Sequence, residues 1–317
     1  MISRRNLLAA LPAASALAAP ALASTPRTTR LVVSSAPGAS LDALARILAP
    51  ALSARLGAPV VVENQGGANG LLAAQQVARA EPDGSTLLVT GDAIILAGLA
   101  QPDAGVSLDG FAPVIQAVRA AQILAVHTVS PIRDIAGYVA AVRARPGALN
   151  VAIPAQGGIA QVVHALLGRQ LGGLPVEFVS FRGGGPAIQS LLARDVDALV
   201  ITLPAITEQV RGGTIRGLAV STATRDPALP DVPTLAETVA PGFDVDSWQG
   251  ILAPLRTPPA TVAALHAHFA AALADATVAE RLRALGFAIT ALPPAEFRAR
   301  AAASAALFAP VVQQAQG

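Results

Sequence analysis

Residues 31–46 contain a short apolar segment, a tight turn and the beginning of an amphipathic segment. Residues 31–33 favour a strand, residues 37–39 (Pro-Gly-Ala) favour a turn, and apolar residues then recur at helical spacing. Ser40 is the predicted N-cap, and Asp42 places a carboxylate in the positively polarised first turn. Loops of this kind bind small ligands, and anions in particular, at the carboxyl ends of strands in open α/β sheets. The alternative is an ordinary strand-to-helix turn with a solvated Asp42.

The same succession of strand, polar or glycine-rich loop and helix recurs along the chain. Further loops follow apolar segments at residues 64–70, 90–92, 154–158 and 181–186. Such alternation predicts parallel βαβ units with right-handed crossovers. Because the carboxyl ends of parallel strands meet at one edge of a sheet, we expect two α/β blocks whose loops gather at equivalent edges.

Other segments predict the remaining elements. Residues 111–117 and 122–127 favour two separate strands, and residues 245–252 favour a late strand that carries Trp248. Pro186 is predicted at the first position of a helix, where its missing N–H costs nothing. Trp248 is expected to anchor the core near a hinge, with the wall of a cleft as the alternative.

The composition excludes several classes of chemistry. All 22 basic residues are arginines, so the chain lacks a lysine for a Schiff base or a P-loop, and it has no cysteine for a thiol nucleophile or a Cys-based metal site. Nucleophile-elbow, zinc-protease and dinucleotide-binding motifs are missing from the sequence as well. The 4 histidines are expected to be structural. A length of 317 residues suggests about two domains, with a cleft between them.

The first 23 residues have the features of a secretory signal peptide. Arg4 and Arg5 precede an uncharged run rich in Ala and Leu, and small residues predict cleavage before Ser24. The paired arginines also resemble a twin-arginine signal, so the general secretory and twin-arginine routes both stay open. Cleavage would leave 20 arginines and 20 acidic residues, a balance unlike that of nucleic-acid-binding proteins. No later segment predicts a membrane span.

Six long motifs follow one another along the mature chain: PGASLDALAR (37–46), VVENQGGANG (61–70), VARAEPDGSTLL (77–88), FRGGGPAIQSLLARDVD (181–197), IRGLAVSTATRDPALPDVPTLAE (215–237) and PGFDVDSWQGILAP (241–254). Together they resemble the tripartite tricarboxylate transporter receptors, the Bug family of periplasmic solute-binding proteins. The resemblance implies a type II periplasmic binding-protein fold of the α/β class. It implies two lobes, each a mostly parallel sheet flanked by helices, joined by crossing strands, with the ligand in the cleft between them. The implied boundaries are 24–121 with 222–317 for the first lobe, and 122–221 for the second.

The resemblance also implies which loops hold the ligand. In the first lobe they supply Ala36, Pro37, Gly38, Ala39, Ser40, Asp42, Thr90, Gly91 and Asp92. In the second lobe they supply Ala155, Gln156, Gly157, Gln161, Arg182, Gly183 and Gly184. A simple helix N-cap is the alternative role for Asp92.

Three departures from the family pattern lie in or beside these loops. Ala39 stands in place of a glycine, which is a minor change if its φ is negative. Gln65-Gly66 stands in place of an arginine-proline pair. Gln161 replaces a small hydroxylated residue and offers two donors and an acceptor. These changes bear on the identity of the ligand.

The implied function is that of a periplasmic receptor, not an enzyme. We expect it to capture a small carboxylate, such as a dicarboxylate or tricarboxylate, an acidic amino acid or an aromatic acid. Closure of the cleft would present the ligand to the membrane permease subunits of a tripartite tricarboxylate transporter. We expect a monomer without cofactor, metal or nucleic acid, and an Asp92 that could select an ammonium group. The alternative is a periplasmic hydrolase of a small carboxylate-containing substrate.

Overall fold

The computed structural model of the chain describes residues 27–101 and 106–314. The predicted signal peptide, residues 1–23, lies outside the described residues. The strands are β1 (Thr29–Val33), β2 (Val60–Asn64), β3 (Thr86–Gly91), β4 (Phe111–His127), β5 (Asn150–Ile153), β6 (Glu177–Ser180), β7 (Ala198–Thr202), β8 (Ile215–Val220), β9 (Asp246–Pro254) and β10 (Ala288–Leu292).

Eleven α-helices and three short 3-10 helices connect these strands in the described part of the chain. The α-helices are α1 (Ser40–Leu56), α2 (Leu71–Ala78), α3 (Ala93–Ala100), α4 (Ile135–Ala144), α5 (Ile159–Gln170), α6 (Gly184–Ala193), α7 (Thr207–Arg211), α8 (Leu235–Thr238), α9 (Pro259–Leu273), α10 (Ala276–Ala284) and α11 (Pro294–Gln314). The 3-10 helices are η1 (Ala68–Gly70), η3 (Leu108–Gly110) and η4 (Leu203–Ala205).

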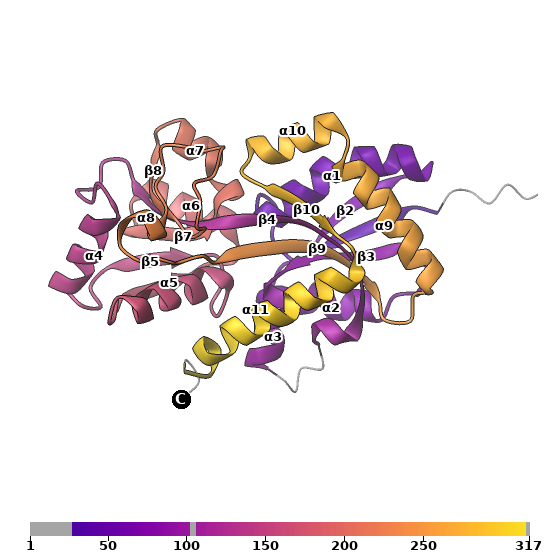
Figure 1. Cartoon of the computed structure of the whole chain (residues 1–317), viewed down its shortest axis with the longest axis horizontal. Helices are drawn as coiled ribbons and strands as arrows, with labels where there is room; N and C mark the ends of the chain where they lie inside the picture. The colour runs from indigo at the N-terminus through magenta and orange to yellow at the C-terminus, as the bar shows by residue number, and fades with distance from the viewer. Residues whose placement is uncertain (1–26, 102–105, 315–317) are drawn as a thin grey trace, which may run out of the picture.

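The elements fall into two lobes that share strand β4 (Figure 1). We call the elements around β1, β2, β3, β9 and β10 lobe 1, and those around β5, β6, β7 and β8 lobe 2. In lobe 1, β1 pairs in parallel with β2 and β3, and β9 pairs antiparallel with β3 and β4. In lobe 2, β5 pairs in parallel with β6 and β7, while β7 and β8 pair antiparallel with β4. The loops at the carboxyl ends of β1 and β6, one from each lobe, lie against each other.

Strand β4 corrects the prediction of two separate strands. Its 17 residues run without a break, and it pairs with β9 as far as Ala121 and with β7 from Gln122 onward. Arg119 is the one exposed residue in this strand. The sequence pattern is misleading here because a single outward-facing arginine interrupts an apolar run that is otherwise buried in the sheet. The strand thus passes directly from lobe 1 into lobe 2.

Apolar packing covers both faces of the sheet in lobe 1. On one face, α1 and α9 contribute Leu44, Leu48 and Phe269. On the other face, Trp248 is fully buried and meets Phe297 of α11 edge-on, with 5.0 Å between ring centroids. The prediction that Trp248 anchors the core is confirmed.

Helix α11 also reaches across to lobe 2. Nη2 of Arg169, in the last turn of α5, donates to the carbonyl oxygen of Pro310 at 3.1 Å and to Oε1 of Gln314 at 2.8 Å. Figure 1 shows α11 running beneath both lobes, with its carboxyl end below α5.

Helix α6 begins two residues earlier than predicted. It starts at Gly184, so Pro186 is its third residue rather than its first. The proline is still tolerated because the amides of a helix's first turn have no intrahelical acceptor.

No single helix among the described residues is long and apolar enough to cross a bilayer. Only α9 and α10 taken as a pair reach the required length and composition, and they are bent by 71° with respect to each other.

Candidate ligand-binding site

Loops from both lobes meet where their strands end. In lobe 1 they follow β1, β2 and β3, and in lobe 2 they follow β5 and β6. A methyl group placed on Gly183, after β6, would lie 2.8 Å from Cβ of Ala36, after β1. A methyl group on Gly66, after β2, would lie 3.0 Å from the backbone N of Ala36. The structure therefore packs the loop after β1 between loops of both lobes.

The predicted site residues differ in how far they are buried. Exposed are Pro37, Gly38, Gln156, Gly157 and Arg182. Half-buried are Ala36, Ala39, Ala155, Gln161 and Gly183. Buried are Ser40, Asp42, Thr90, Gly91, Asp92 and Gly184.

The buried Asp42 carboxylate fixes the loop that precedes it. Its Oδ2 accepts a hydrogen bond from the backbone N–H of Gly38 at 3.0 Å. Its Oδ1 accepts from Nε of Arg46 at 2.8 Å and from Nδ2 of Asn64 at 3.0 Å. Burial by itself raises the pKa of Asp42, but these hydrogen bonds outweigh it and hold the pKa below its usual value. Asp42 is thus a buried anchor rather than a solvated residue.

The start of α1 differs from the prediction that Ser40 is its N-cap. Ala39 holds that position with φ −80°, so the family's glycine is replaced without backbone strain. The Ser40 hydroxyl instead accepts a hydrogen bond from Nε2 of Gln249 in β9, at 2.7 Å. The prediction is wrong because Ser40 contacts the neighbouring strand, while Asp42 binds the loop amide.

Gln249 is a residue that sequence reasoning missed. It is 2% exposed in the middle of β9, and its Oε1 has no hydrogen-bond partner among the described residues. An amide in the middle of an apolar strand is costly to bury unless it has a polar partner. The sequence WQGIL carried that signal.

In lobe 2, Gln161 shapes the loop after β5. Its Oε1 accepts from the backbone N–H of Gly157 at 2.7 Å, across one turn at the start of α5. The loop after β6 is tied to it, because the N–H of Gly183 donates to the carbonyl oxygen of Pro154 at 2.9 Å. Two helices, α5 and α6, therefore begin side by side.

A direct hydrogen bond joins the lobes beside these helix starts. Nδ2 of Asn69, in η1 of lobe 1, donates to the carbonyl oxygen of Gln156 in lobe 2 at 2.7 Å. Asn69 has φ +52°, a conformation that asparagine tolerates better than most residues. Sequence analysis placed Asn69 in a loop but missed this contact, because its partner lies 87 residues away.

Asp92 holds the N-cap position of α3, but its side chain makes no capping hydrogen bond and lies against β9 instead. Its Oδ2 accepts from Oγ of Ser247 at 2.7 Å and from the N–H of Trp248 at 3.2 Å, and Oδ1 has no partner among the described residues. Burial raises the pKa of Asp92 to about 7, although the Ser247 hydrogen bond opposes this. The nearby carboxylate of Asp246 raises it further.

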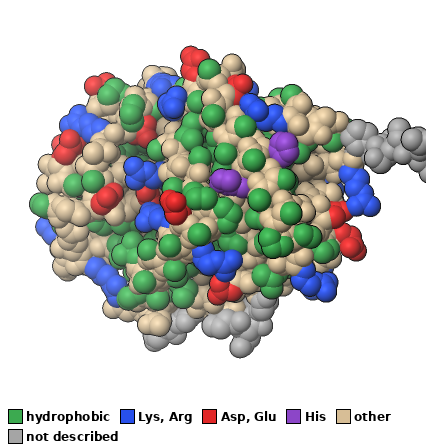
Figure 2. All heavy atoms as spheres, turned by 45° about the vertical axis from the view of Figure 1, so that its right-hand side comes forward, with side chains coloured by type: hydrophobic (Ala, Val, Ile, Leu, Met, Phe, Trp, Pro, Cys, Tyr) green, Lys and Arg blue, Asp and Glu red, His purple; other side chains and the backbone are tan. Residues whose placement is uncertain are grey.

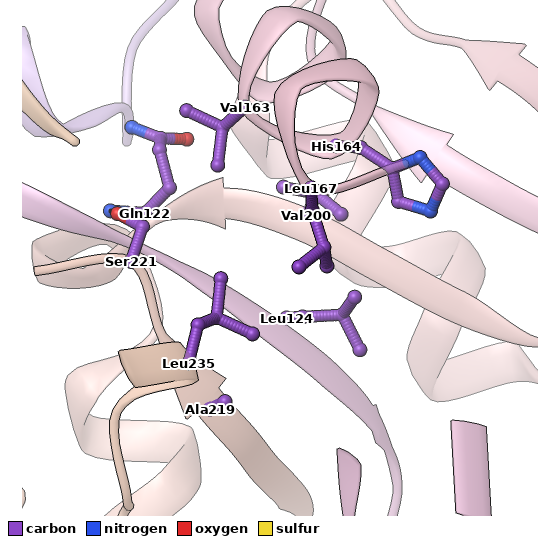
Figure 3. Close-up of a pocket in the computed structure, with 9 residues that line it drawn as sticks. All are labelled: Gln122, Leu124, Val163, His164, Leu167, Val200, Ala219, Ser221 and Leu235. Atoms are coloured by element: carbon purple, nitrogen blue, oxygen red, sulfur yellow. The ribbon is translucent and has the colours of Figure 1, made fainter. Parts of the chain in front are cut away.

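The histidine nearest the loops has a structural environment. His164 on α5 is 3% exposed, and its Nε2 lies 2.8 Å from the hydroxyl of Tyr138. Burial lowers the pKa of His164 to about 4, which keeps the ring neutral. Figure 3 shows Leu124, Val200 and Leu235 lining the cavity beside this ring. Its volume of about 10 Å³ is at the lower limit for holding one water molecule and is too small for a ligand.

Among the residues that the structure describes, no three His, Cys, Asp or Glu side chains are grouped to hold a metal ion. Figure 2 shows basic and acidic side chains interspersed on the face in view. That face carries no basic patch of the kind that a nucleic-acid-binding protein presents.

Comparison with known proteins identifies the family. Residues 44–309 match the family model described as tripartite tricarboxylate transporter family receptor. Protein BugT of Bordetella pertussis is 33% identical over 279 residues, covering 86% of this chain and 85% of BugT. A UPF0065 protein encoded between tcbD and tcbE in a Pseudomonas species is 34% identical over 257 residues, covering 80% of this chain and 76% of that protein.

Solved structures agree on the fold. MatC from Rhodopseudomonas palustris, with bound malate, has a TM-score of 0.83 at 32% identity, covering 90% of this chain and 99% of that one. R. palustris Rpa4515, with adipate, has a TM-score of 0.87 at 30% identity, covering 92% of this chain and 97% of that one. The periplasmic binding protein BugD has a TM-score of 0.85 at 29% identity, covering 92% of this chain and 98% of that one. The chain therefore has the two-lobed α/β fold of periplasmic binding proteins, and it belongs to the tripartite tricarboxylate transporter receptors, a family of substrate-binding receptors rather than enzymes.

Proposed function

We propose that this receptor captures a small dicarboxylate in the cleft between its lobes. The observation that carries the proposal is the meeting of loops that open α1, α5 and α6, because the free amides of helix N-termini bind anions. The proposed contacts are residues 36–42, 90–92, 155–161 and 182–184. Asp42 and Asp92 act by holding these loops in place, since hydrogen bonds from the protein engage both carboxylates.

The relatives support a carboxylate ligand with two acidic groups. The similar structures of MatC and Rpa4515 hold malate and adipate. A ligand with a carboxylate at each end can engage amides of both lobes at once. Such a ligand stabilises the closed arrangement because it binds that arrangement better than the open one.

The proposed hinge lies where chain segments pass between lobes. In β4 this is residues 121–122, where pairing changes from β9 to β7, and on the return it is the start of β9, where Asp246 pairs with Ala121. Rotation about these points would separate the loops and admit the ligand. We propose that membrane permease subunits of the transporter then recognise the closed form of the monomer, and that no cofactor takes part.

A thermal-shift screen tests the function. We expect four-carbon to six-carbon dicarboxylates to raise the unfolding midpoint of the mature protein, since a ligand at a hundred times its Kd stabilises by about 2.7 kcal/mol. Mass spectrometry of the recovered ligand should show it unchanged, as for a receptor and unlike a hydrolase. Stabilisation by no dicarboxylate would contradict the proposal, as would turnover of the ligand.

Two variants at Asp42 separate anchoring from ligand contact. Asp42→Asn keeps an oxygen acceptor for the Gly38 amide, so we expect dicarboxylate affinity within about tenfold of the wild type, or 1.4 kcal/mol. Asp42→Ala removes the acceptor, and we expect weaker binding and a stability loss of about 0.5 to 2 kcal/mol. Titration calorimetry and thermal unfolding measure the two effects. Equal and complete loss of binding in both variants would mean that the charge itself holds the ligand.

The hydrogen bond between Asn69 and Gln156 should favour the closed form. Asn69→Gly removes the amide while glycine accepts φ +52° without strain. We expect dicarboxylate affinity to fall by a factor of about 2 to 10, the value of one hydrogen bond of 0.5 to 1.5 kcal/mol. Asn150→Ala, at an exposed position that starts β5, is the control. Unchanged affinity in the Asn69 variant would show that this bond does not contribute to closure.

The export prediction is tested by intact mass. We expect the protein recovered from the periplasm to begin at Ser24 after removal of residues 1–23. A mass that includes those residues would contradict the predicted signal peptide. Inactivating either the general secretory or the twin-arginine pathway then identifies the route.

A further inference from the structure

The loops that open α1 and α5 are two copies of one structure, one in each lobe. Residues 36–42 form the first copy and residues 155–161 the second. Each contains a turn whose second central residue is a glycine with positive φ, +80° at Gly38 and +68° at Gly157, as a type II turn requires. The residue after each glycine is the helix N-cap, with φ −80° in both copies. Its N–H donates to the carbonyl oxygen three residues earlier, at 3.4 Å in lobe 1 and 3.2 Å in lobe 2.

The two copies differ in chemistry at the third residue of the helix. Asp42 holds this position in α1 and Gln161 holds it in α5, and each accepts the N–H of the turn glycine, at 3.0 and 2.7 Å. Arg46, one turn later in α1, balances the charge of Asp42 at a distance of 2.8 Å. Ala165 has the corresponding place in α5. Gln161 therefore makes the same contact as Asp42 without a charge and without a charged partner.

The orientation of the Gln161 amide is fixed by its partner. The N–H of Gly157 is a donor, so only Oε1 of Gln161 can face it. The same peptide unit is held at its other end, because the carbonyl oxygen of Gln156 accepts from Nδ2 of Asn69 in lobe 1 at 2.7 Å. Nε2 of Gln161 has no hydrogen-bond partner among the described residues, and the residue is half-buried. Both N–H groups of Nε2 are thus available to a ligand beside the contact between the lobes.

Acceptors for a positively charged group are already engaged around these turns. Three donors occupy the two oxygens of Asp42. Asp92 is 1% exposed, its Oδ2 accepts two hydrogen bonds, and its Oδ1 is buried. In lobe 2 the carbonyl oxygens of residues 154–156 each accept a hydrogen bond from the protein. Arg182 adds an exposed guanidinium with no partner among the described residues. An ammonium group that leaves water here would meet donors where it needs acceptors.

We propose that Gln161 sets the charge selectivity of the cleft: because its amide offers a ligand only donors, lobe 2 binds a carboxylate and excludes an ammonium group. This inference rests on the proposed function and narrows the ligand to a dicarboxylate without an amino group. An amino dicarboxylate bound the other way round gains nothing, because its ammonium group would lie at the α1 turn, where the oxygens of Asp42 are engaged. A hydroxyl group in the same place is tolerated, since its oxygen can accept from Nε2 of Gln161.

Ligands of matched shape test the selectivity. The four-carbon to six-carbon dicarboxylate that binds most tightly is compared by calorimetry with its 2-hydroxy and 2-amino derivatives, for example succinate with L-malate and L-aspartate. We expect the 2-amino derivative to bind at least tenfold more weakly than the 2-hydroxy derivative, which has nearly the same size. Equal or tighter binding of the 2-amino derivative overturns this proposal and leaves the proposed function in place. Failure of the proposed function appears separately, as a thermal-shift screen in which no dicarboxylate stabilises the protein.

Gln161→Glu tests whether this residue is responsible. The variant keeps an oxygen acceptor for the N–H of Gly157 and replaces the two N–H donors with a negative charge. It should fold, because an acidic residue in the first turn of a helix is favourable, and circular dichroism checks this. We expect dicarboxylate affinity to fall at least tenfold, with a smaller loss as the salt concentration rises. The preference for the 2-hydroxy over the 2-amino derivative should narrow at least tenfold.

Gln189→Glu is the matched control, because it makes the same change at an exposed position of α6 in the same lobe. It should leave both affinities and their ratio as in the wild type. A purely structural role for Gln161 would weaken the two derivatives equally and keep their ratio, so an unchanged ratio in Gln161→Glu overturns the proposal.

Discussion

Gly183→Ala should reduce dicarboxylate affinity about a hundredfold while the protein stays folded. The new methyl group would lie 2.8 Å from Cβ of Ala36 in the other lobe, closer than two carbon atoms can pack. The clash exists only while the lobes touch, so it raises the free energy of the closed form alone. Affinity falls by the factor by which the closed form is disfavoured, and a hundredfold corresponds to about 2.8 kcal/mol.

Gly157→Ala is the control for backbone strain. Gly183 has φ +112° and ψ 174°, a conformation essentially confined to glycine, and Gly157 has φ +68°, so an alanine is strained at both positions and more strongly at Gly183. The methyl group at Gly157 would meet nothing nearer than Nδ2 of Asn69 at 3.6 Å, an ordinary contact distance. The difference in affinity between the two variants therefore reports the contact between the lobes together with the extra strain at Gly183.

Titration calorimetry with the tightest dicarboxylate from the screen measures both affinities, and circular dichroism confirms that both variants fold. We expect Gly157→Ala to bind within about tenfold of the wild type. Equal losses in the two variants would mean that strain, rather than closure, governs binding. Wild-type affinity in Gly183→Ala would show that the ligand does not bind between these two loops.

The parts of the site that sequence could predict are local. A strand, a glycine-rich loop and the start of a helix lie within about 15 residues of each other, so the sequence of residues 31–46 is enough to predict their local structure. The role of Asp42 as an anchor is local too, since it accepts from Gly38 and Arg46, each four residues away. The same holds for Gln161 and Gly157.

The parts that sequence could not predict depend on distant partners. Asn69 and Gln156 come together only after two lobes form. Asp246 pairs with Arg119 and Arg300, which lie 127 and 54 residues away from it in the sequence. The continuity of β4 was missed because the outward-facing Arg119 interrupts an apolar run that is otherwise buried in the sheet. Ser40, the first residue of α1, was misassigned because its partner Gln249 lies in β9, 209 residues away in the sequence.

Asp92→Asn should make the protein more stable at high pH than at low pH, relative to the wild type. The pKa of Asp92 is about 7 in the folded protein, against an ordinary value of 3.8, and burial is the main cause. A raised pKa means that the folded state binds the proton more tightly than the unfolded state. Its contribution to stability is complete below pH 4 and is lost as the pH rises through 7.

The expected size of this loss is about 4 kcal/mol, from a difference of about 3 pKa units. An asparagine resembles the protonated carboxyl group: its oxygen can accept from Ser247 and Trp248, and it carries no charge that burial would penalise. The variant should therefore match the wild type near pH 4 and exceed it by several kcal/mol at pH 8. Chemical denaturation at a series of pH values measures the difference.

Asp231→Asn, on an exposed turn, controls for the loss of one carboxylate from the protein's net charge. Its free energy of unfolding should follow the wild type at every pH. Parallel curves for Asp92→Asn and the wild type would show that Asp92 is ionised in the folded state over the whole range. In that case the folded protein would have to stabilise the Asp92 charge, with Arg300 as one contributor. If the curves diverge as expected, the link between the β3 loop and β9 is held by a neutral carboxyl group near pH 6, and it weakens as that group loses its proton.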